Sequence, residues 1–87
     1  MTNQEKKLVG KVTHYYGKIG VAVVELTDEL SVGDMISIEG GVTNFQQNVD
    51  SMEIEHQQIK KAKAGDAIGL KVKDKVREGD SIYKIIA

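Results

Sequence analysis

The sequence predicts a small all-β domain that folds as a closed, six-stranded antiparallel β-barrel. Apolar and polar residues alternate in two stretches, 52–55 and 67–72, as is typical of half-buried strands. A Gly-Asp pair occurs three times, each followed by an isoleucine two residues after the aspartate: Gly33-Asp34, Gly65-Asp66 and Gly79-Asp80. Turns that start strands in the same phase favour an all-β domain, and closure into a barrel removes exposed sheet edges. An open sandwich is the structural alternative.

Composition indicates one domain over residues 7–87, preceded by a polar tail over residues 1–6 that we expect to be disordered. Hydrophobic residues make up 40% of the chain and charged residues 29%, which is ordinary for a globular protein. Cysteine is absent, which excludes disulfide bonds and thiolate metal sites. No apolar run reaches the length of a membrane span, and residues 1–7 do not resemble a signal peptide. We therefore expect a cytoplasmic protein without a membrane partner.

The predicted elements follow one another with short turns. The six strands are predicted over residues 7–16, 19–26, 34–39, 43–58, 66–73 and 81–86. The polar connection 27–32 carries Leu30 and Val32 as apolar plugs for one end of the barrel. Within 43–58 the apolar residues change parity between Val49 and Met52, which predicts a β-bulge or bend near residues 50–51. Residues 59–64 are expected to form a loop, with a short helical turn as the alternative.

The glycine of each Gly-Asp pair has a specific role in this prediction. A turn of this kind needs a positive φ, which glycine adopts at little steric cost. We therefore expect replacement of any of the three glycines by valine to destabilise the domain.

Charge is nearly balanced, with a net value of −1, which is unlike the strongly basic domains that bind nucleic acid backbones. Residues 51–87 nevertheless hold eight Lys or Arg against six acidic residues. Lys71, Lys73 and Lys75 share one strand face and are suited to following a phosphate backbone. The alternative is that they form the ordinary solvated side of a strand.

The motifs of common enzymes are missing. There is neither a glycine-rich phosphate-binding loop nor a nucleophile elbow, so we expect no catalytic residues, no bound nucleotide and no cofactor. His14 and His56 are 42 positions apart and show no metal-ligand spacing, so we expect no metal site. Tyr15 and Tyr16 are adjacent on a strand, so alternation leaves at most one of them exposed for stacking on a base.

Glu53 differs from the other acidic residues in its position. It lies just past the predicted bend, between the inward-facing Met52 and Ile54, and should project from the outer surface of a well-supported strand. Periodicity alone is equally satisfied by a plain solvated carboxylate.

The order of the motifs along the chain resembles a known family. The motifs are a G-x-V strand, V-E-L, L-x-V-G-D-x-I-x-I, V-x-S-M-E-I, A-x-A-G-D-x-I-G-L and V-R-x-G-D. In this order they resemble the second, β-barrel domain of translation GTPases such as elongation factor Tu, over about nine-tenths of the chain. The GTPase domain and the third barrel of those proteins have no counterpart here.

The resemblance implies a site as well as a fold. In the elongation factor this barrel holds the aminoacylated 3′ end of tRNA, beside a glutamate that Glu53 matches. The apolar walls of that pocket would correspond to Gly20, Val21 and the segment from Ile68 to Leu70. His56 stands where the bacterial form tends to have an arginine. Lys71 and Lys73 would compensate the charge of the carboxylate near phosphates.

Two functions follow from these observations, and neither is enzymatic. The first is a translation-factor-like module that binds the tRNA acceptor end or ribosomal RNA. The second is a protein-interaction barrel that docks to a separate GTPase or other enzyme. Similar barrels also end some peptidases of another family.

Overall fold

The computed structural model describes residues 5–86 and consists of strands and turns throughout that range. Ten strands follow in chain order: β1 (Lys6–Tyr16), β2 (Val21–Leu26), β3 (Leu30–Ser31), β4 (Met35–Glu39), β5 (Asn44–Asn48), β6 (Met52–Ile54), β7 (Gln57–Ile59), β8 (Lys61–Ala62), β9 (Ala67–Lys71) and β10 (Ser81–Ile85). The predicted all-β class is confirmed. No helix within residues 5–86 is long and apolar enough to cross a membrane.

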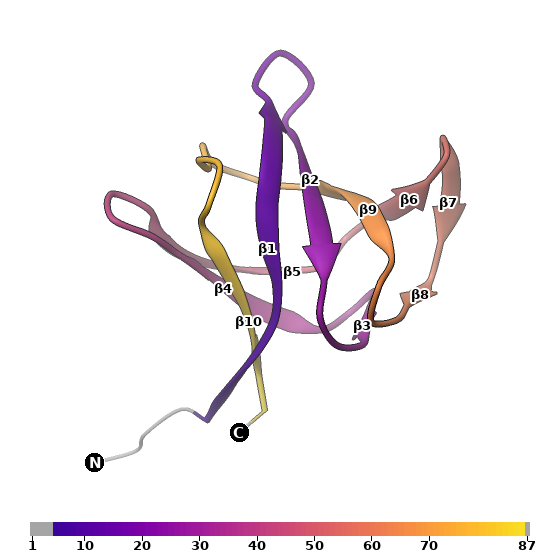
Figure 1. Ribbon diagram of the computed structural model, residues 1–87, viewed down its shortest axis with the longest axis horizontal. Coiled ribbons are helices and arrows are strands. Elements are labelled where there is room, and N and C mark those ends of the chain that lie inside the picture. Colours follow the sequence, from indigo (N-terminus) through magenta and orange to yellow (C-terminus); the bar gives the residue numbers. More distant parts are fainter. Residues whose placement is uncertain (1–4, 87) are drawn as a thin grey trace.

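Eight of the strands form one antiparallel sheet in the order β5-β4-β10-β1-β2-β9-β6-β7, and β3 pairs with β8 in a small second sheet. Figure 1 shows the large sheet curling around a common interior, with the β1–β2 loop at the top and the β6–β7 hairpin at the upper right. The interior is a single apolar cluster, made largely of alternate residues of the longer strands. Ala22, Val24 and Leu26 of β2 are typical members, each at most 2% exposed.

The prediction of a closed six-stranded barrel is wrong, because the large sheet keeps two free edges, β5 and β7. Where closure would join β5 to the end of β9, a side chain takes the place of ladder hydrogen bonds. The Nε2 of Gln47 donates to the carbonyl of Lys71 at 2.8 Å, and the N–H of Lys73 donates to the Oε1 of Gln47 at 2.8 Å. One buried carboxamide therefore holds the two sides of the fold together without continuing the sheet.

The segment predicted as one strand over residues 43–58 is three strands. The predicted bend is confirmed, since β5 ends at Asn48 and β6 begins at Met52. The hairpin turn at Glu55 and His56, which leads into β7, was not predicted. Residues 59–64, expected to be a loop, contain β8, whose Ala62 pairs with Leu30 of β3.

Two smaller expectations concern the ends of elements. Leu30 is fully buried, as expected of a plug, but Val32 is 41% exposed, so that part of the prediction is wrong. Residues 1–4 of the expected tail lie outside the described residues. The described part of the tail is ordered, since β1 begins at Lys6 and the carbonyl of Glu5 accepts the N–H of Ile86 at 2.8 Å.

The three Gly-Asp turns have the same construction. Their glycines have the predicted positive φ: 97° at Gly33, 93° at Gly65 and 92° at Gly79. In each turn the aspartate N–H donates to the carbonyl three residues earlier, and the aspartate carboxylate accepts the N–H of that same residue, which is Ser31, Lys63 or Arg77. Each aspartate thus closes a four-residue turn with a glycine in its third position, as in a type II turn.

Each turn is also fastened to a neighbouring part of the fold in the same way. The glycine N–H donates to the carbonyl of a buried apolar residue, and the N–H of that residue donates to the aspartate carbonyl. These apolar partners are Val49 for the first turn, Leu26 for the second and Val12 for the third. Each Gly-Asp pair therefore marks a turn that is tied to a buried core residue by the same two backbone hydrogen bonds.

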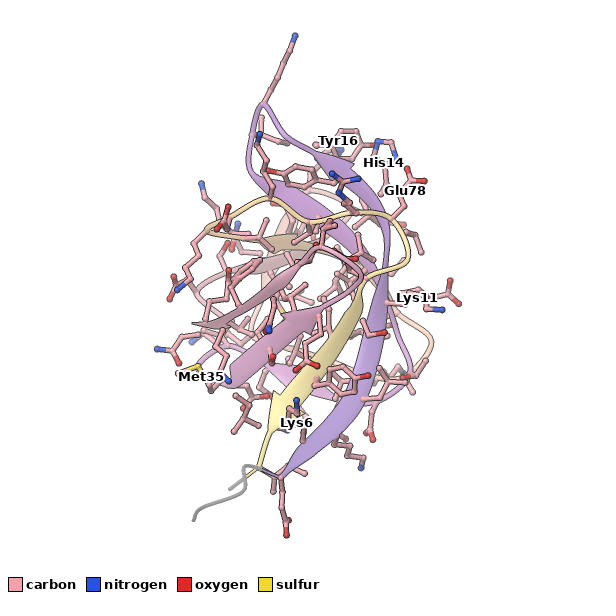
Figure 2. All side chains as sticks on the ribbon, turned by 90° about the vertical axis from the view of Figure 1, so that its left-hand side faces the viewer. Lys6, Lys11, His14, Tyr16, Met35 and Glu78 are labelled. Carbon is pink, nitrogen blue, oxygen red and sulfur yellow. The ribbon has the colours of Figure 1, made fainter. Side chains whose placement is uncertain are left out.

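Glu39, at the end of β4, gives the domain a pH-dependent contact. Its carboxylate accepts hydrogen bonds from Lys6 Nζ at 2.6 Å and from Ser37 Oγ at 2.7 Å. The hydrogen bond from Lys6, followed by that from Ser37, lowers the pKa of Glu39 below its usual value of 4.5. Figure 2 shows Lys6 at the opposite end of the molecule from His14, Tyr16 and Glu78.

We expect Glu39→Gln to lower the melting temperature at neutral pH and to have less effect in acid. The folded-state pKa of Glu39 lies below its unfolded value, so its contribution to stability is present above about pH 4.5. That contribution is lost as the pH falls through the folded-state pKa of Glu39. Melting curves of the wild type and of Glu39→Gln between pH 2 and 7 measure this loss. A difference in melting temperature between the two proteins that stays constant with pH would contradict the prediction.

Candidate functional site

A shallow groove of about 360 Å³ lies on the outer face of the sheet, over β2, β9 and β6. We call it the Glu53 groove. Its apolar part consists of Tyr16, Ile19, Val21, Val23, Ala67 and Gly69, and its polar rim of Glu53, Glu55 and His56. Its lining residues come from β9, from the β1–β2 hairpin and from the β6–β7 hairpin, and Figure 1 shows that the β1–β2 loop and the β6–β7 hairpin stand out from the sheet.

Strand pairing explains why the floor of the groove is apolar. Val23 of β2 and Glu53 of β6 both pair with Gly69 of β9, so the three residues form one row across the sheet. Side chains alternate along a strand, so Val21 lies on the same outer face of β2 as Val23, next to this row. Two apolar outer positions of a central strand are thus only half-buried here.

Gly69 keeps the centre of the groove open. A Cβ at this position would lie 3.2 Å from Cγ of Glu53 and 3.4 Å from Cγ1 of Val21. These two side chains therefore lean over the glycine from either side, and any larger residue would displace them.

The rim is carried by an unusual turn. Glu55 and His56 have φ values of 50° and 65°, which are left-handed values that non-glycine residues seldom adopt. Two successive positive φ values in a two-residue hairpin loop match a type I′ turn, for which Asn-Gly is the usual sequence. Strained backbone of this kind costs on the order of 1–3 kcal/mol per residue. The turn holds both side chains at the edge of the groove.

Part of the groove is formed by an exposed aromatic residue and an exposed aliphatic residue of the β1–β2 hairpin. Tyr16 is 51% exposed and Ile19 is 62% exposed, whereas Tyr15 packs against the core. The ring of Tyr16 lies 4.4 Å from that of His14, whose Nδ1 lies 3.2 Å from Oε2 of Glu78. Figure 2 shows Tyr16, His14 and Glu78 together at one end of the molecule.

The structure brings together half of the residues expected at the site. Glu53, His56 and Val21 line the Glu53 groove with partly or fully exposed side chains, whereas Ile68 borders the groove but its side chain is buried in the core. The other four lie elsewhere: Gly20, Leu70, Lys71 and Lys73. The side chain of Leu70 is fully buried in the core, so it is not exposed to a ligand.

The remaining three residues of that group serve other parts of the fold. Gly20 has a positive φ of 65°, and its carbonyl accepts the N–H of Val72 at 2.9 Å. Lys71 and Lys73 line a second groove, of about 440 Å³, together with the end of β5. Lys71 and Lys73 therefore line a different groove from Glu53, so they do not compensate the charge of its carboxylate within one site as expected.

Sequence reasoning placed Gly69 at the site, within the segment from Ile68 to Leu70, but missed other groove residues, namely Tyr16, Ile19, Val23, Glu55 and Ala67. Val23 was hidden because β2 reads as a continuous apolar run, which does not reveal the exposed face. Among residues 5–86 no three His, Asp or Glu side chains are grouped closely enough to hold a metal ion. The groove is suited to apolar contact bordered by carboxylates.

Comparison with known proteins identifies similar chains of a different kind from those expected. No protein-family model matches the chain. It is 41% identical over 76 residues to the "Uncharacterized protease MJ0090" of Methanocaldococcus jannaschii, and 39% identical over 83 residues to a collagenase of Porphyromonas gingivalis. These matches cover 86% and 93% of this chain but 19% and 23% of the relatives, so the chain spans about a fifth of their length.

Solved structures show the same fold. Two crystal structures of the C-terminal domain of a Geobacillus thermoleovorans putative U32 peptidase superpose with TM-scores of 0.83 and 0.84 at 22% identity. The matches cover 87% and 90% of this chain, and 96% and 91% of those domains.

These findings correct the interpretation drawn from the motifs. The resemblance to the second domain of translation GTPases is wrong, since the relatives and the structural matches are peptidases and a collagenase. The predicted function as a translation-factor-like module is wrong on the same evidence, whereas binding of tRNA or ribosomal RNA stays a prediction. The prediction that the chain is not enzymatic is contradicted by the relatives named protease and collagenase, about a fifth of whose length it matches. The chain has the fold of the C-terminal domain of a putative U32 peptidase.

Proposed function

We propose that this chain acts as a polypeptide-binding domain of a U32-type peptidase. The observation that carries this proposal is identity of 39–41% over most of the chain with proteins named protease and collagenase, of which it matches about a fifth. A segment of that size leaves room in such a protein for a separate catalytic part. Its contribution to the reaction would be to hold the polypeptide that is cut.

The Glu53 groove supports this role by its chemistry. Exposed apolar side chains that cluster between charged ones are typical of interaction sites. Tyr16 and Ile19 line the groove with exposed side chains, and Val21 and Val23 are half-buried along its floor. The neighbouring β7 is a free sheet edge, to which an extended peptide can add. Both features favour an unfolded polypeptide as the occupant.

Denatured collagen is the appropriate first ligand, because two of the relatives are named collagenase. We expect gelatin added to the isotopically labelled chain to shift the backbone amide signals of β2, β6 and β9. Ile19→Ser should weaken binding because it removes an exposed apolar contact of the groove. Leu8→Ser is the matched control, since Leu8 is also an exposed large apolar residue, at 49%, but lies outside the groove.

Two outcomes would contradict the proposal. One is the absence of binding to gelatin and to other unfolded polypeptides, such as denatured casein. The other is equal loss of affinity in the Ile19→Ser and Leu8→Ser variants, which would mean that binding does not involve the groove.

A further inference from the structure

We infer that the Glu53 groove selects a lysine or arginine side chain of the bound polypeptide. This inference rests on the proposed function and names the kind of residue that the site recognises. It is carried by three features of the groove: an apolar floor of the right kind for an alkyl chain, two carboxylates at the rim, and an exposed tyrosine ring.

The floor matches the stem of a long basic side chain. Val21, Val23 and Ala67 present aliphatic surface around Gly69, over which the Cγ methylene group of Glu53 also lies. Lysine and arginine side chains lay their methylene groups along such apolar surface while their charged ends stay in contact with water. A shallow open groove allows this arrangement, whereas a closed cavity would force the charge out of water.

The rim supplies the charge that a basic side chain needs. Glu53 and Glu55 both line the groove, and no Lys or Arg among the described residues lines it with them. Within residues 5–86 neither glutamate forms an ion pair. The polar contact of Glu53 is a long one, 3.5 Å from Nε2 of Gln58.

Five of the other eleven acidic residues of the domain are held in ion pairs, unlike Glu53 and Glu55. Asp28, Glu29, Asp34, Glu39 and Glu78 each lie within 4 Å of a basic nitrogen of this chain, at distances from 2.6 to 3.6 Å. The carboxylates of Glu53 and Glu55 can therefore still accept hydrogen bonds from a group that enters the groove from the solvent. A cation from outside the chain would satisfy them.

The ring of Tyr16 adds a third contact. Its exposed position in the groove offers an aromatic face to a cationic group, and arginine in particular stacks on such rings. Glutamate or aspartate in the polypeptide would instead meet two like charges. An uncharged side chain of the same length would gain the apolar contact alone.

The test compares capped peptides of one sequence that differ at a central position, which is lysine, arginine, norleucine or glutamate. Norleucine keeps the alkyl stem and removes the charge. We expect the lysine and arginine peptides to bind about two- to fivefold more tightly than the norleucine peptide, as an ion pair exposed to solvent implies. The glutamate peptide should bind most weakly, and added salt should reduce the differences.

Substitutions in the groove locate the effect. Glu53→Gln and Glu55→Gln keep the shape of the side chains and should each reduce the preference for lysine over norleucine. Glu29→Gln is the matched control, because Glu29 is exposed, lies outside the groove and should leave the preference unchanged. Circular dichroism spectra of the variants check that they are folded.

The results separate this inference from the function on which it rests. Equal binding of the lysine and norleucine peptides, together with retained binding of gelatin, would overturn the selection of basic residues and leave the polypeptide-binding role in place. Loss of the preference in Glu29→Gln as well would also overturn the inference, because it would assign the effect to the net charge of the domain. Failure of gelatin and of every peptide to bind would overturn both.

Discussion

Replacement of Leu70 by alanine is expected to lower the free energy of unfolding by about 2–5 kcal/mol, the range for removal of a buried leucine side chain. Leu70 lies in β9, is 0% exposed, and pairs across the sheet with Ala22 of β2 and Met52 of β6. Alanine would leave a cavity at the point where three strands meet. Urea denaturation of the wild type and the variant measures the loss.

Lys71→Ala is the matched control for Leu70→Ala, because Lys71 is the next residue of the same strand and its side chain is exposed. Its carbonyl, which accepts the hydrogen bond from Gln47, is unaffected by the substitution. We expect a change within about 0.5 kcal/mol, as is usual for a surface position. Equal unfolding midpoints for the two variants would show that Leu70 is not a core residue.

Valine in place of Gly79 is expected to destabilise the domain by about 1–3 kcal/mol, the cost of holding a non-glycine residue in a left-handed conformation. Gly79 has a φ of 92°, and no heavy atom of another part of the chain lies within 4 Å of the position that a Cβ would take. The loss would therefore come from backbone strain and not from a clash. Gly33 and Gly65 share both properties, so valine there should have a similar effect.

Gly41 provides the control for this series. A Cβ there would also meet no heavy atom within 4 Å, but Gly41 is not among the glycines with positive φ. Valine at Gly41 should therefore leave the melting temperature close to that of the wild type. The prediction fails if Gly41→Val and Gly79→Val melt at the same temperature.

Much of the fold could be predicted because the relevant signals are local. The Gly-Asp pairs identify their own turns, since the positive φ and the aspartate cap involve residues only three apart. The bend after β5 follows from the change of parity between Val49 and Met52. Closure of the sheet could not be predicted in this way. It depends on whether β5 meets the end of β9 through backbone or side chain, and the role of Gln47 is set by residues 24 and 26 positions away.

The candidate site was partly predictable for the same reason. The outward position of Glu53 follows from its place between Met52 and Ile54. Ile19 lines the groove because of how the β1–β2 hairpin lies relative to β9. The local sequence pattern around Ile19 contains no information about that arrangement. The turn at Glu55 and His56 was missed because it lacks the glycine or asparagine that normally marks two successive positive φ values.

The pairing of the first and last long strands has a mechanical consequence. β1 and β10 are antiparallel neighbours, and the hydrogen bond between Glu5 and Ile86 brings the described ends of the chain to one corner of the fold. Tension applied through both ends would peel these two strands apart, breaking their hydrogen bonds one after another instead of all at once. The load would reach the register shift between Leu8 and Gly10 only after the outer pairs had opened. The fold would thus yield gradually under force, while the β6–β7 hairpin stays outside the path along which that force is transmitted.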